Sequence, residues 1–370
     1  MSEENKTNNP QELTLTQLRS MIKNAGYDWV AGETPISRLS DEEQKIRLGL
    51  EVPEDEMERI KSVLAKEIKA FAFAPKRDWR DKDGKNWVTT VQDQGGCGSC
   101  VAFGTVATIE SQARIQYNKP AWDIDLSEAD LFFCGAGRKC KKGWWPSYAL
   151  DYAKSKGISD EKCFPYQDED IDCTLCSDRA DRLLKIGKWH EIINIDQRKQ
   201  WLDTKGPMVA CMAVYSDFFK YKDGVYRHTT GDLAGYHAIC CIGYSEEEKC
   251  WICKNSWGTG WGNQGFFKIG YGEAEMDTKF AMYGVEEITG TLTPNGEEED
   301  YDWAEHVVID HNFEANQRVL WAYVKGKWRY QFVSDVQLAG IGNALFEANS
   351  VQVWFKGNKI SCIRGWKKFS

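Results

Sequence analysis

Apolar residues recur at helical spacing near the start of the chain and at alternating positions near its end. Residues 15–26 place apolar side chains on one face of a helix, and residues 55–70 repeat this pattern. Between them, Ser40 followed by the acidic residues 41–43 is typical of a helix N-terminus. Residues 1–75 are therefore predicted to form a charged helical segment.

The last part of the chain is predicted to be a small β-rich domain, residues 302–370. Residues 318–333 and 350–366 alternate apolar and polar positions, and each run is broken by a turn containing glycine. An acidic stretch, residues 293–301, precedes them and has the composition of a linker. The tryptophans of this tail are expected in a core, with a carbohydrate- or protein-binding face as the alternative, and the domain's partner is not indicated by the sequence.

Composition excludes several classes of function. The 370 residues are 42% hydrophobic. The chain has no run of about 18 apolar residues, the length needed to span a bilayer, so no membrane partner is expected. A formal net charge of -9 makes nucleic acid an unfavourable partner. The first ten residues have no apolar run of the kind that forms a signal peptide. Because the chain has 13 cysteines, at least one thiol must remain unpaired within it.

Residues 91–103, VQDQGGCGSCVAF, place a cysteine at the predicted start of an apolar helix. Backbone N–H groups at a helix N-terminus favour a thiolate, so Cys100 is predicted to be a nucleophile. The alternative is a metal or redox site, because Cys97 and Cys100 form a CxxC pair and Cys250 and Cys253 form another. The second pair lies in a predicted strand, where side chains three apart point to opposite faces, so no metal site is expected.

A base for this nucleophile is found among only five histidines. His237 begins an apolar strand, and Asn255 follows a second apolar strand 18 residues later, beside Trp257. A thiol, an imidazole and an amide that orients the imidazole form a nucleophile–base–orienter set. The three residues are therefore predicted to act together.

With these residues the chain resembles the papain-like cysteine peptidases. The CGSC cluster is followed by His237 and Asn255 at separations of 137 and 155 residues from Cys100, close to the family's spacing, and the likeness covers residues 78–287. The resemblance implies an α+β fold with a helical left lobe and a β-barrel-like right lobe, over residues 76–292. It assigns Cys100 as the nucleophile, His237 as general base and acid, Asn255 as the orienting group, and Gln94 with the Cys100 N–H as the oxyanion hole.

The resemblance also implies a substrate groove, with two departures from the family pattern. Val101 stands where most relatives have tryptophan, and Tyr236 stands where many have aspartate or asparagine. Gly143 matches the glycine that pairs with extended substrate, and the main specificity pocket is expected to favour an apolar or aromatic side chain. The implied substrate-binding residues are Gly143, Trp144, Trp145, Pro146, Cys211, Tyr236, Ala238 and Trp257.

Three disulfides follow from the same resemblance. It pairs Cys97 with Cys140 and Cys134 with Cys173, and it leaves Cys163 and Cys176 to close a further small loop. Cys100 then stays free. Bonds of this kind persist in oxidising compartments, so a secreted or similarly oxidising location is favoured although no signal peptide is seen.

The function implied is hydrolysis of peptide bonds through an acyl-thioester, without a cofactor, and by an endopeptidase rather than an exopeptidase. Two alternatives remain: a catalytically silent binding protein, and a peptide ligase or transferase that uses the same thioester. Residues 1–75 are expected to be a prosegment that folds over the groove as an intramolecular inhibitor. The non-helical stretch 30–37 is the part expected to lie extended there, and activating cleavage is expected near residues 70–78.

Overall fold

The computed structural model describes residues 14–54, 73–293, 300–312, 317–333, 348, 350–356 and 359–366. The chain divides into two compact units, Met1–Leu292 and Thr293–Ser370, and each is described by itself. The predicted helix at residues 55–70 lies outside the described residues. Within the described part of the chain, no helix has the length and apolar character needed to cross a membrane.

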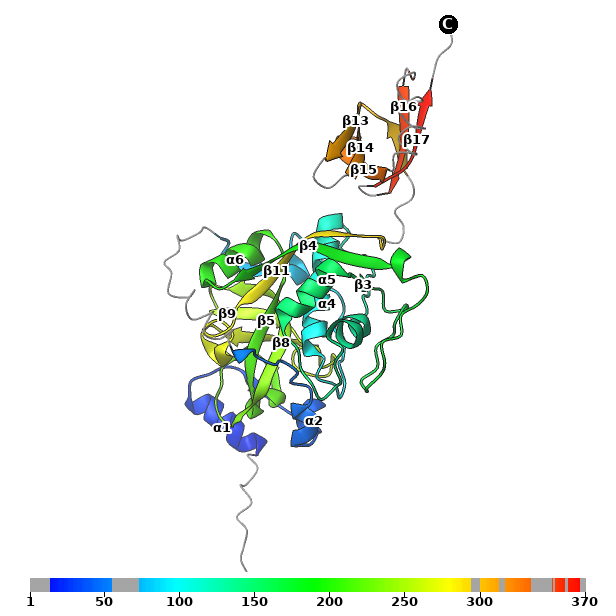
Figure 1. Ribbon diagram of the computed structural model, residues 1–370. Helices are drawn as coiled ribbons and strands as arrows, with labels where there is room; N and C mark the ends of the chain where they lie inside the picture. Colours follow the sequence, from blue (N-terminus) through cyan, green and yellow to red (C-terminus); the bar gives the residue numbers. More distant parts are fainter. Residues whose placement is uncertain are drawn as a thin grey trace, which may run out of the picture. The chain divides into compact units, whose positions relative to one another are not determined.

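The helical lobe of the first unit is built around one buried helix. α4 (Cys100–Tyr117) is buried along its first fifteen residues, since small side chains let it pack closely against the sheet. At Gly104 an added Cβ would lie 3.1 Å from the Ile239 carbonyl oxygen, so only a very small residue fits this crossing. The π-helical segment η3 (Asp130–Ala136) and helix α5 (Pro146–Ser155) complete this lobe, with Pro146 in the first turn of α5. Figure 1 shows α4 and α5 beside each other against the sheet.

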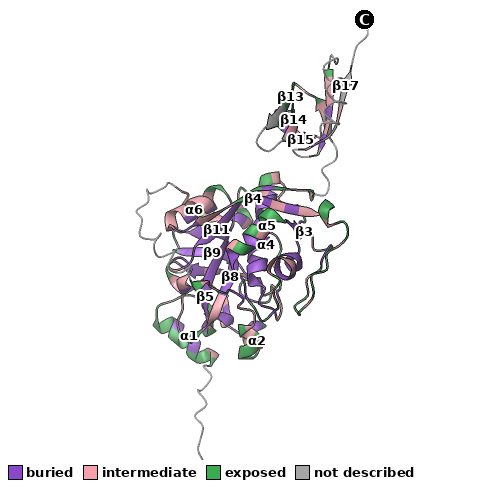
Figure 2. Cartoon of the chain, viewed as in Figure 1, coloured by how far each residue is buried: buried purple, intermediate pink, exposed green. Residues whose placement is uncertain are grey.

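The second lobe is a mixed sheet in the order β3-β4-β11-β5-β8-β9-β10-β7, with β2 paired to β8. Its ends, β3 and β7, do not pair with each other, so the predicted barrel-like lobe is an open sheet among the described strands. Of the inner strands, β5 is buried except at its last residue and β8 is buried from His237 onward, and these parts are purple in Figure 2. The bounds are β2 (Lys76–Asp78), β3 (Ile158–Ser159), β4 (Leu183–Ile192), β5 (Met208–Tyr215), β6 (Tyr221–Asp223), β7 (Val225–Tyr226), β8 (Leu233–Ser245), β9 (Cys250–Lys254), β10 (Phe266–Gly270) and β11 (Met282–Gly290), with helix α6 (Ile195–Thr204) after β4.

The N-terminal segment packs on this unit through short elements. α1 (Leu15–Asn24) and α2 (Asp41–Lys45), blue in Figure 1, each begin with a capping box, at Thr14 and Ser40. The expectation that residues 30–37 lie in the groove is wrong. β1 (Val30–Ala31) instead pairs with β6 at the edge of the second lobe, because its backbone hydrogen bonds are satisfied there. The stretch that follows α2 takes the place expected for residues 30–37.

The second unit is a six-stranded sheet in the order β12-β16-β17-β15-β14-β13. Its core is mainly aliphatic, with Leu320, Ala322, Val324 and Val353 among its buried members. The expectation that the tail's tryptophans form the core is therefore wrong for two of them, since Trp303 and Trp328 are 48% and 46% exposed. The smaller aliphatic side chains fill the inner face. The strands are β12 (Asp300–Trp303), β13 (His306–Asn312), β14 (Gln317–Val324), β15 (Lys327–Val333), β16 (Ser350–Lys356) and β17 (Lys359–Trp366).

Candidate active site

Cys100 is the first residue of α4, as the sequence predicts. The turn before it is fixed by the disulfide between Cys97 and Cys140 and by the Gly98 N–H, which donates to the Cys140 carbonyl at 2.8 Å. The alternative CxxC pair of Cys97 with Cys100 is not formed, since the sulfur of Cys97 is bonded to Cys140. Cys100 is a free thiol and fully buried.

His237 and Asn255 are brought together by two adjacent strands. His237 lies on β8 and Asn255 follows β9, and His237 Nε2 lies 2.8 Å from Asn255 Oδ1. Asn255 Oδ1 also accepts the Ser256 N–H at 2.8 Å, so it is the carbonyl oxygen that faces the imidazole. Nε2 therefore carries a proton, and Nδ1 is the nitrogen that can accept one from a thiol. The indole of Trp257 covers the imidazole, with ring centroids 4.8 Å apart.

Gln94 presents its side-chain amide toward the same place. Its Oε1 accepts the Ser256 hydroxyl at 2.7 Å, which fixes the orientation of the amide. Its Nε2 donates to two carbonyls, that of Cys97 at 2.8 Å and that of Arg47 at 3.0 Å. Arg47 belongs to the N-terminal segment, so the predicted oxyanion donor is occupied by a carbonyl of the chain's own first part.

Residues 47–51 cross this site, leaving a turn at Arg47 and forming a β-bridge at Leu50. Leu50 forms a parallel bridge with Trp144, in which the Trp144 N–H donates to the Gly49 carbonyl at 2.9 Å and the Glu51 N–H to the Trp144 carbonyl at 3.1 Å. On the other side, the Leu50 N–H donates to the Tyr236 carbonyl at 3.3 Å. A Cβ added to Gly49 would lie 1.8 Å from the Gly98 carbonyl oxygen, so only glycine allows this approach to the nucleophile turn.

Burial sets the protonation of both reacting groups. It raises the pKa of the Cys100 thiol from 9.0 to about 11, although backbone N–H groups, including that of Gly49, oppose the shift. Burial also lowers the pKa of His237 from 6.5 to about 4, against the hydrogen bonds of Asn255 and the Arg47 carbonyl. The sequence-based expectation of a thiolate is wrong for this closed form. Desolvation outweighs the helix N-terminus, and both groups are neutral between these two pKa values.

The implied substrate-binding residues lie around the same stretch of the N-terminal segment. Cys211 pairs with Ala238 across β5 and β8, and both are fully buried. Lys279 donates to the Tyr236 hydroxyl at 2.8 Å, so Tyr236 is held by a cation that the sequence analysis did not single out. Gly143, Trp144, Trp145 and Pro146 are all buried, and a Cβ at Gly143 would lie 2.4 Å from the Gly49 carbonyl oxygen.

The first unit contains the three disulfides implied by the resemblance. They join Cys97 to Cys140, Cys134 to Cys173, and Cys163 to Cys176. Cys240, Cys241, Cys250 and Cys253 are free thiols and are buried, and Cys211 is also buried.

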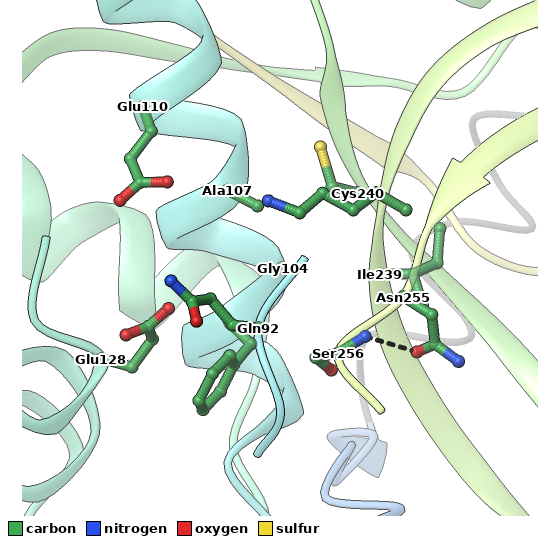
Figure 3. A pocket seen from close by; sticks show the side chains of 11 residues that line it. Gln92, Gly104, Ala107, Glu110, Glu128, Ile239, Cys240, Asn255 and Ser256 are labelled. Atoms are coloured by element: carbon green, nitrogen blue, oxygen red, sulfur yellow. Dashed lines mark hydrogen bonds between the residues drawn. The ribbon is translucent and has the colours of Figure 1, made fainter. Parts of the chain in front are cut away.

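A second ionisable site, an internal cavity behind the active site, was not predicted. Figure 3 shows Glu110, Glu128 and Cys240 around it, next to Asn255 and Ser256. The Lys254 ammonium donates to the Thr89 hydroxyl at 3.0 Å, and that hydroxyl donates to Glu110 at 2.6 Å. Burial raises the pKa of Glu110 to about 7 and that of Glu128 well above its usual value. The signal in the sequence was a charged residue inside each of three apolar elements.

The comparisons with known proteins agree with this geometry. The family described as papain family cysteine protease matches residues 73–286, more than half of the chain. A cathepsin B-like CP3 of Giardia intestinalis is 35% identical over 195 residues, which are 49% of this chain and 64% of that protein. The pro-cathepsin H of Bos taurus is 34% identical over 211 residues, 54% of this chain and 61% of that protein. The chain thus spans less than two thirds of the length of these two relatives.

Two solved structures share the fold. A proCathepsin B S9 from Trypanosoma congolense aligns with a TM-score of 0.61 and 24% identity, over 74% of this chain and 99% of that one. A digestive procathepsin L2 proteinase from Tenebrio molitor larval midgut has the same TM-score with 25% identity, over 74% of this chain and 89% of that one. Both of these proteins are named as procathepsins.

Proposed function

The chain belongs to the papain family of cysteine proteases, and from that premise we propose that it hydrolyses peptide bonds with Cys100, His237, Asn255 and Gln94 and is held inactive by its own N-terminal segment. The observation that carries the proposal is the orientation of His237. Its Nε2 is bound to Asn255 at 2.8 Å, which leaves Nδ1 for the thiol.

The proposed reaction has two halves. The Cys100 thiol gives its proton to His237 Nδ1, and the sulfur attacks the peptide carbonyl carbon. The oxygen that becomes negative is bound by Gln94 Nε2 and the Cys100 N–H. His237 then returns the proton to the leaving amine. Water, activated by the same imidazole, hydrolyses the thioester and restores the thiol.

Self-inhibition is supported by what residues 47–49 place in the site. The Arg47 carbonyl occupies Gln94 Nε2, and the Gly49 N–H rather than a carbonyl carbon faces the Cys100 sulfur. The segment also runs parallel to Trp144, and we propose that substrate runs in the opposite direction. No carbonyl is then presented correctly to the thiol, so the segment blocks the groove without being cut.

Endopeptidase action is the finer proposal. The described residues 46–54 pass through the site as a continuous chain, so the groove accepts a polypeptide that extends beyond it in both directions. A peptide blocked at both ends should therefore be cut in its interior. Failure to cut blocked peptides, with cleavage of free-ended ones, would make the protein an exopeptidase.

The test of the proposed function compares the uncut chain with the chain cleaved between residues 69 and 78. Cleavage should raise turnover of a small peptide, and adding the separated N-terminal segment should lower it again. Equal turnover before and after cleavage would contradict self-inhibition. Product masses measured with and without an added amine acceptor distinguish hydrolysis from the ligase or transferase alternative. A chain that reacts neither with peptide substrates nor with thiol-reactive peptide electrophiles would be the catalytically silent binding protein.

A further inference from the structure

Four cations precede Gly143 in the chain and are called here the basic rim: Arg138, Lys139, Lys141 and Lys142. Of these, Arg138 contacts the N-terminal segment at the groove. The four cations fall within five consecutive residues, and the proposed catalytic reaction uses none of them. All four side chains are partly or fully exposed. The rim is attached firmly to the nucleophile turn, because Cys140 in its middle is bonded to Cys97.

The N-terminal segment places an acidic side chain against this rim. Glu51 accepts the Gly143 N–H on Oε1 at 2.9 Å, and its Oε2 lies 3.6 Å from Arg138 Nη1. Residues 51–56, EVPEDE, are acidic at four of six positions, whereas residues 138–142 are basic at four of five. The described acidic residues Glu51 and Glu54 therefore lie on the same cavity as Arg138 and complement its charge.

Space for a further side chain remains beside this contact. A cavity of about 270 Å³ lies between residues 51–54 and the wall formed by Arg138, Trp144, Trp145 and Tyr148. Part of the rim's charge is already compensated, since Lys139 Nζ lies 3.5 Å from Asp172. Among the described residues, Arg138 forms its ion pair with Glu51 of the N-terminal segment and not with residues 76–292.

From these contacts we propose that the basic rim binds an acidic side chain of the substrate, within three residues on the N-terminal side of the bond that is cut. Glu51 holds that place until the N-terminal segment leaves. The proposal rests on the proposed function and on the opposite direction of substrate. The chain residues that follow Gly49, namely Leu50 and Glu51, then overlie the substrate residues that precede the scissile bond.

The first test uses peptides that differ only by Glu, Gln or Lys at each of the three positions before the cut. With the cleaved chain, Glu should raise kcat/KM over Gln about two- to fivefold at one position, the range of a partly exposed ion pair, and Lys should lower it. Arg138→Glu should reverse the order of Glu and Lys. Lys154→Gln, on the exposed side of α5, is the matched control and should leave the order unchanged.

Equal kcat/KM for the Glu and Gln peptides, or a preference unchanged in Arg138→Glu, would overturn the proposal. Cleavage of the Gln peptide separates this outcome from failure of the proposed function, in which no peptide is cut.

A second test needs no peptidase activity and uses the uncut chain. The rate at which an alkylating reagent modifies Cys100 reports how often the segment opens. Glu51→Lys should raise that rate, and Glu51→Lys combined with Arg138→Glu should bring it back toward the original value. Independent effects of the two changes would mean that Glu51 and Arg138 do not interact, and would contradict the rim's role.

Discussion

Two buried ionisable sites flank β8, and they differ in what buries them. Cys100 and His237 are covered by residues 47–50 of the N-terminal segment, whereas Glu110, Lys254 and Cys240 are enclosed by α4, β8 and β9 of the catalytic unit itself. In both sites desolvation dominates, since it raises the thiol pKa of Cys100 to about 11 and that of Cys240 to about 12. Desolvation of Cys100 can therefore be relieved when the N-terminal segment moves away, whereas desolvation of Cys240 lasts as long as the domain is folded.

Under the proposed function, this difference is how one fold would hold a nucleophilic thiol in an unreactive state. Opening the segment returns water to Cys100 and His237, after which the helix N-terminus can favour the thiolate. Nothing comparable can reach Cys240, because its cover is the folded domain.

The largest contrast is expected between the two cysteines. Cys100→Ala should reduce peptide hydrolysis by the cleaved chain by about four orders of magnitude or more, because the nucleophile is lost. Cys240→Ala removes a thiol that only accepts the Thr108 hydroxyl at 3.4 Å, and should leave kcat within a few-fold. Initial rates on one peptide measure both. Comparable losses in the two variants would contradict the assignment of the nucleophile.

Acid is expected to weaken the binding of the N-terminal segment over Cys100 and His237, the second largest effect. The pKa of His237 is lowered to about 4 in the closed form, so the closed state binds fewer protons than an open state with a pKa near 6.5. Closure is thus fully favoured above pH 6.5 and is weakened as pH falls toward 4, by up to roughly 3 kcal/mol. The affinity of the separated N-terminal segment for the cleaved chain should fall accordingly. An affinity that rises on acidification would contradict burial of a neutral His237.

Gly49→Ala should open the segment without any cleavage. An added Cβ would lie 1.8 Å from the Gly98 carbonyl oxygen, a distance that the backbone cannot accommodate without moving. Activity of the uncut chain should rise about tenfold or more, because each 1.4 kcal/mol of lost closure is a factor of ten. Lys45→Ala, exposed in α2, is the control. Unchanged activity of uncut Gly49→Ala would mean that residues 47–51 do not control access.

A change at the internal cavity should lower the stability of the fold and leave the access of reagents to Cys100 unchanged. Lys254→Met removes the buried ammonium that is linked to Glu110 through the Thr89 hydroxyl, and should lower stability by about 3 kcal/mol. The thermal midpoint of the first unit should then fall by several degrees. Cys100 alkylation in the uncut chain should stay slow. A large rise in that rate would show that the two sites are not separately controlled.

The sequence predicted the site best where a chemical task can be done by few residue types, such as the nucleophile and its base. Chemistry and spacing predict Cys100, His237 and Asn255, and the family resemblance adds Gln94. The structure brings these residues to one place, although their roles stay predictions. The crossing segment was misplaced, because an extended stretch looks the same in sequence whether it pairs with a sheet edge or lies in a groove. Gly49 could not be recognised, since its importance comes from the Gly98 carbonyl across the site.

The raised pKa of Cys100 and the lowered pKa of His237 were the features hardest to predict from the sequence. A helix N-terminus can be read from residues 97–103, but burial depends on what covers the thiol, and that cover is contributed from some 50 residues earlier in the chain. The same limit applies to the internal cavity, whose charged residues come from separate elements.

The central claim is that the N-terminal segment keeps Cys100 and His237 neutral by burying them. Its most direct test is the pH dependence of Cys100 alkylation by a small reagent, followed by mass spectrometry on the uncut and the cleaved chain. The uncut chain should react slowly at neutral pH and increasingly toward pH 11, as a buried thiol does, while the cleaved chain should react rapidly below pH 7. Identical profiles for the two forms would contradict the claim.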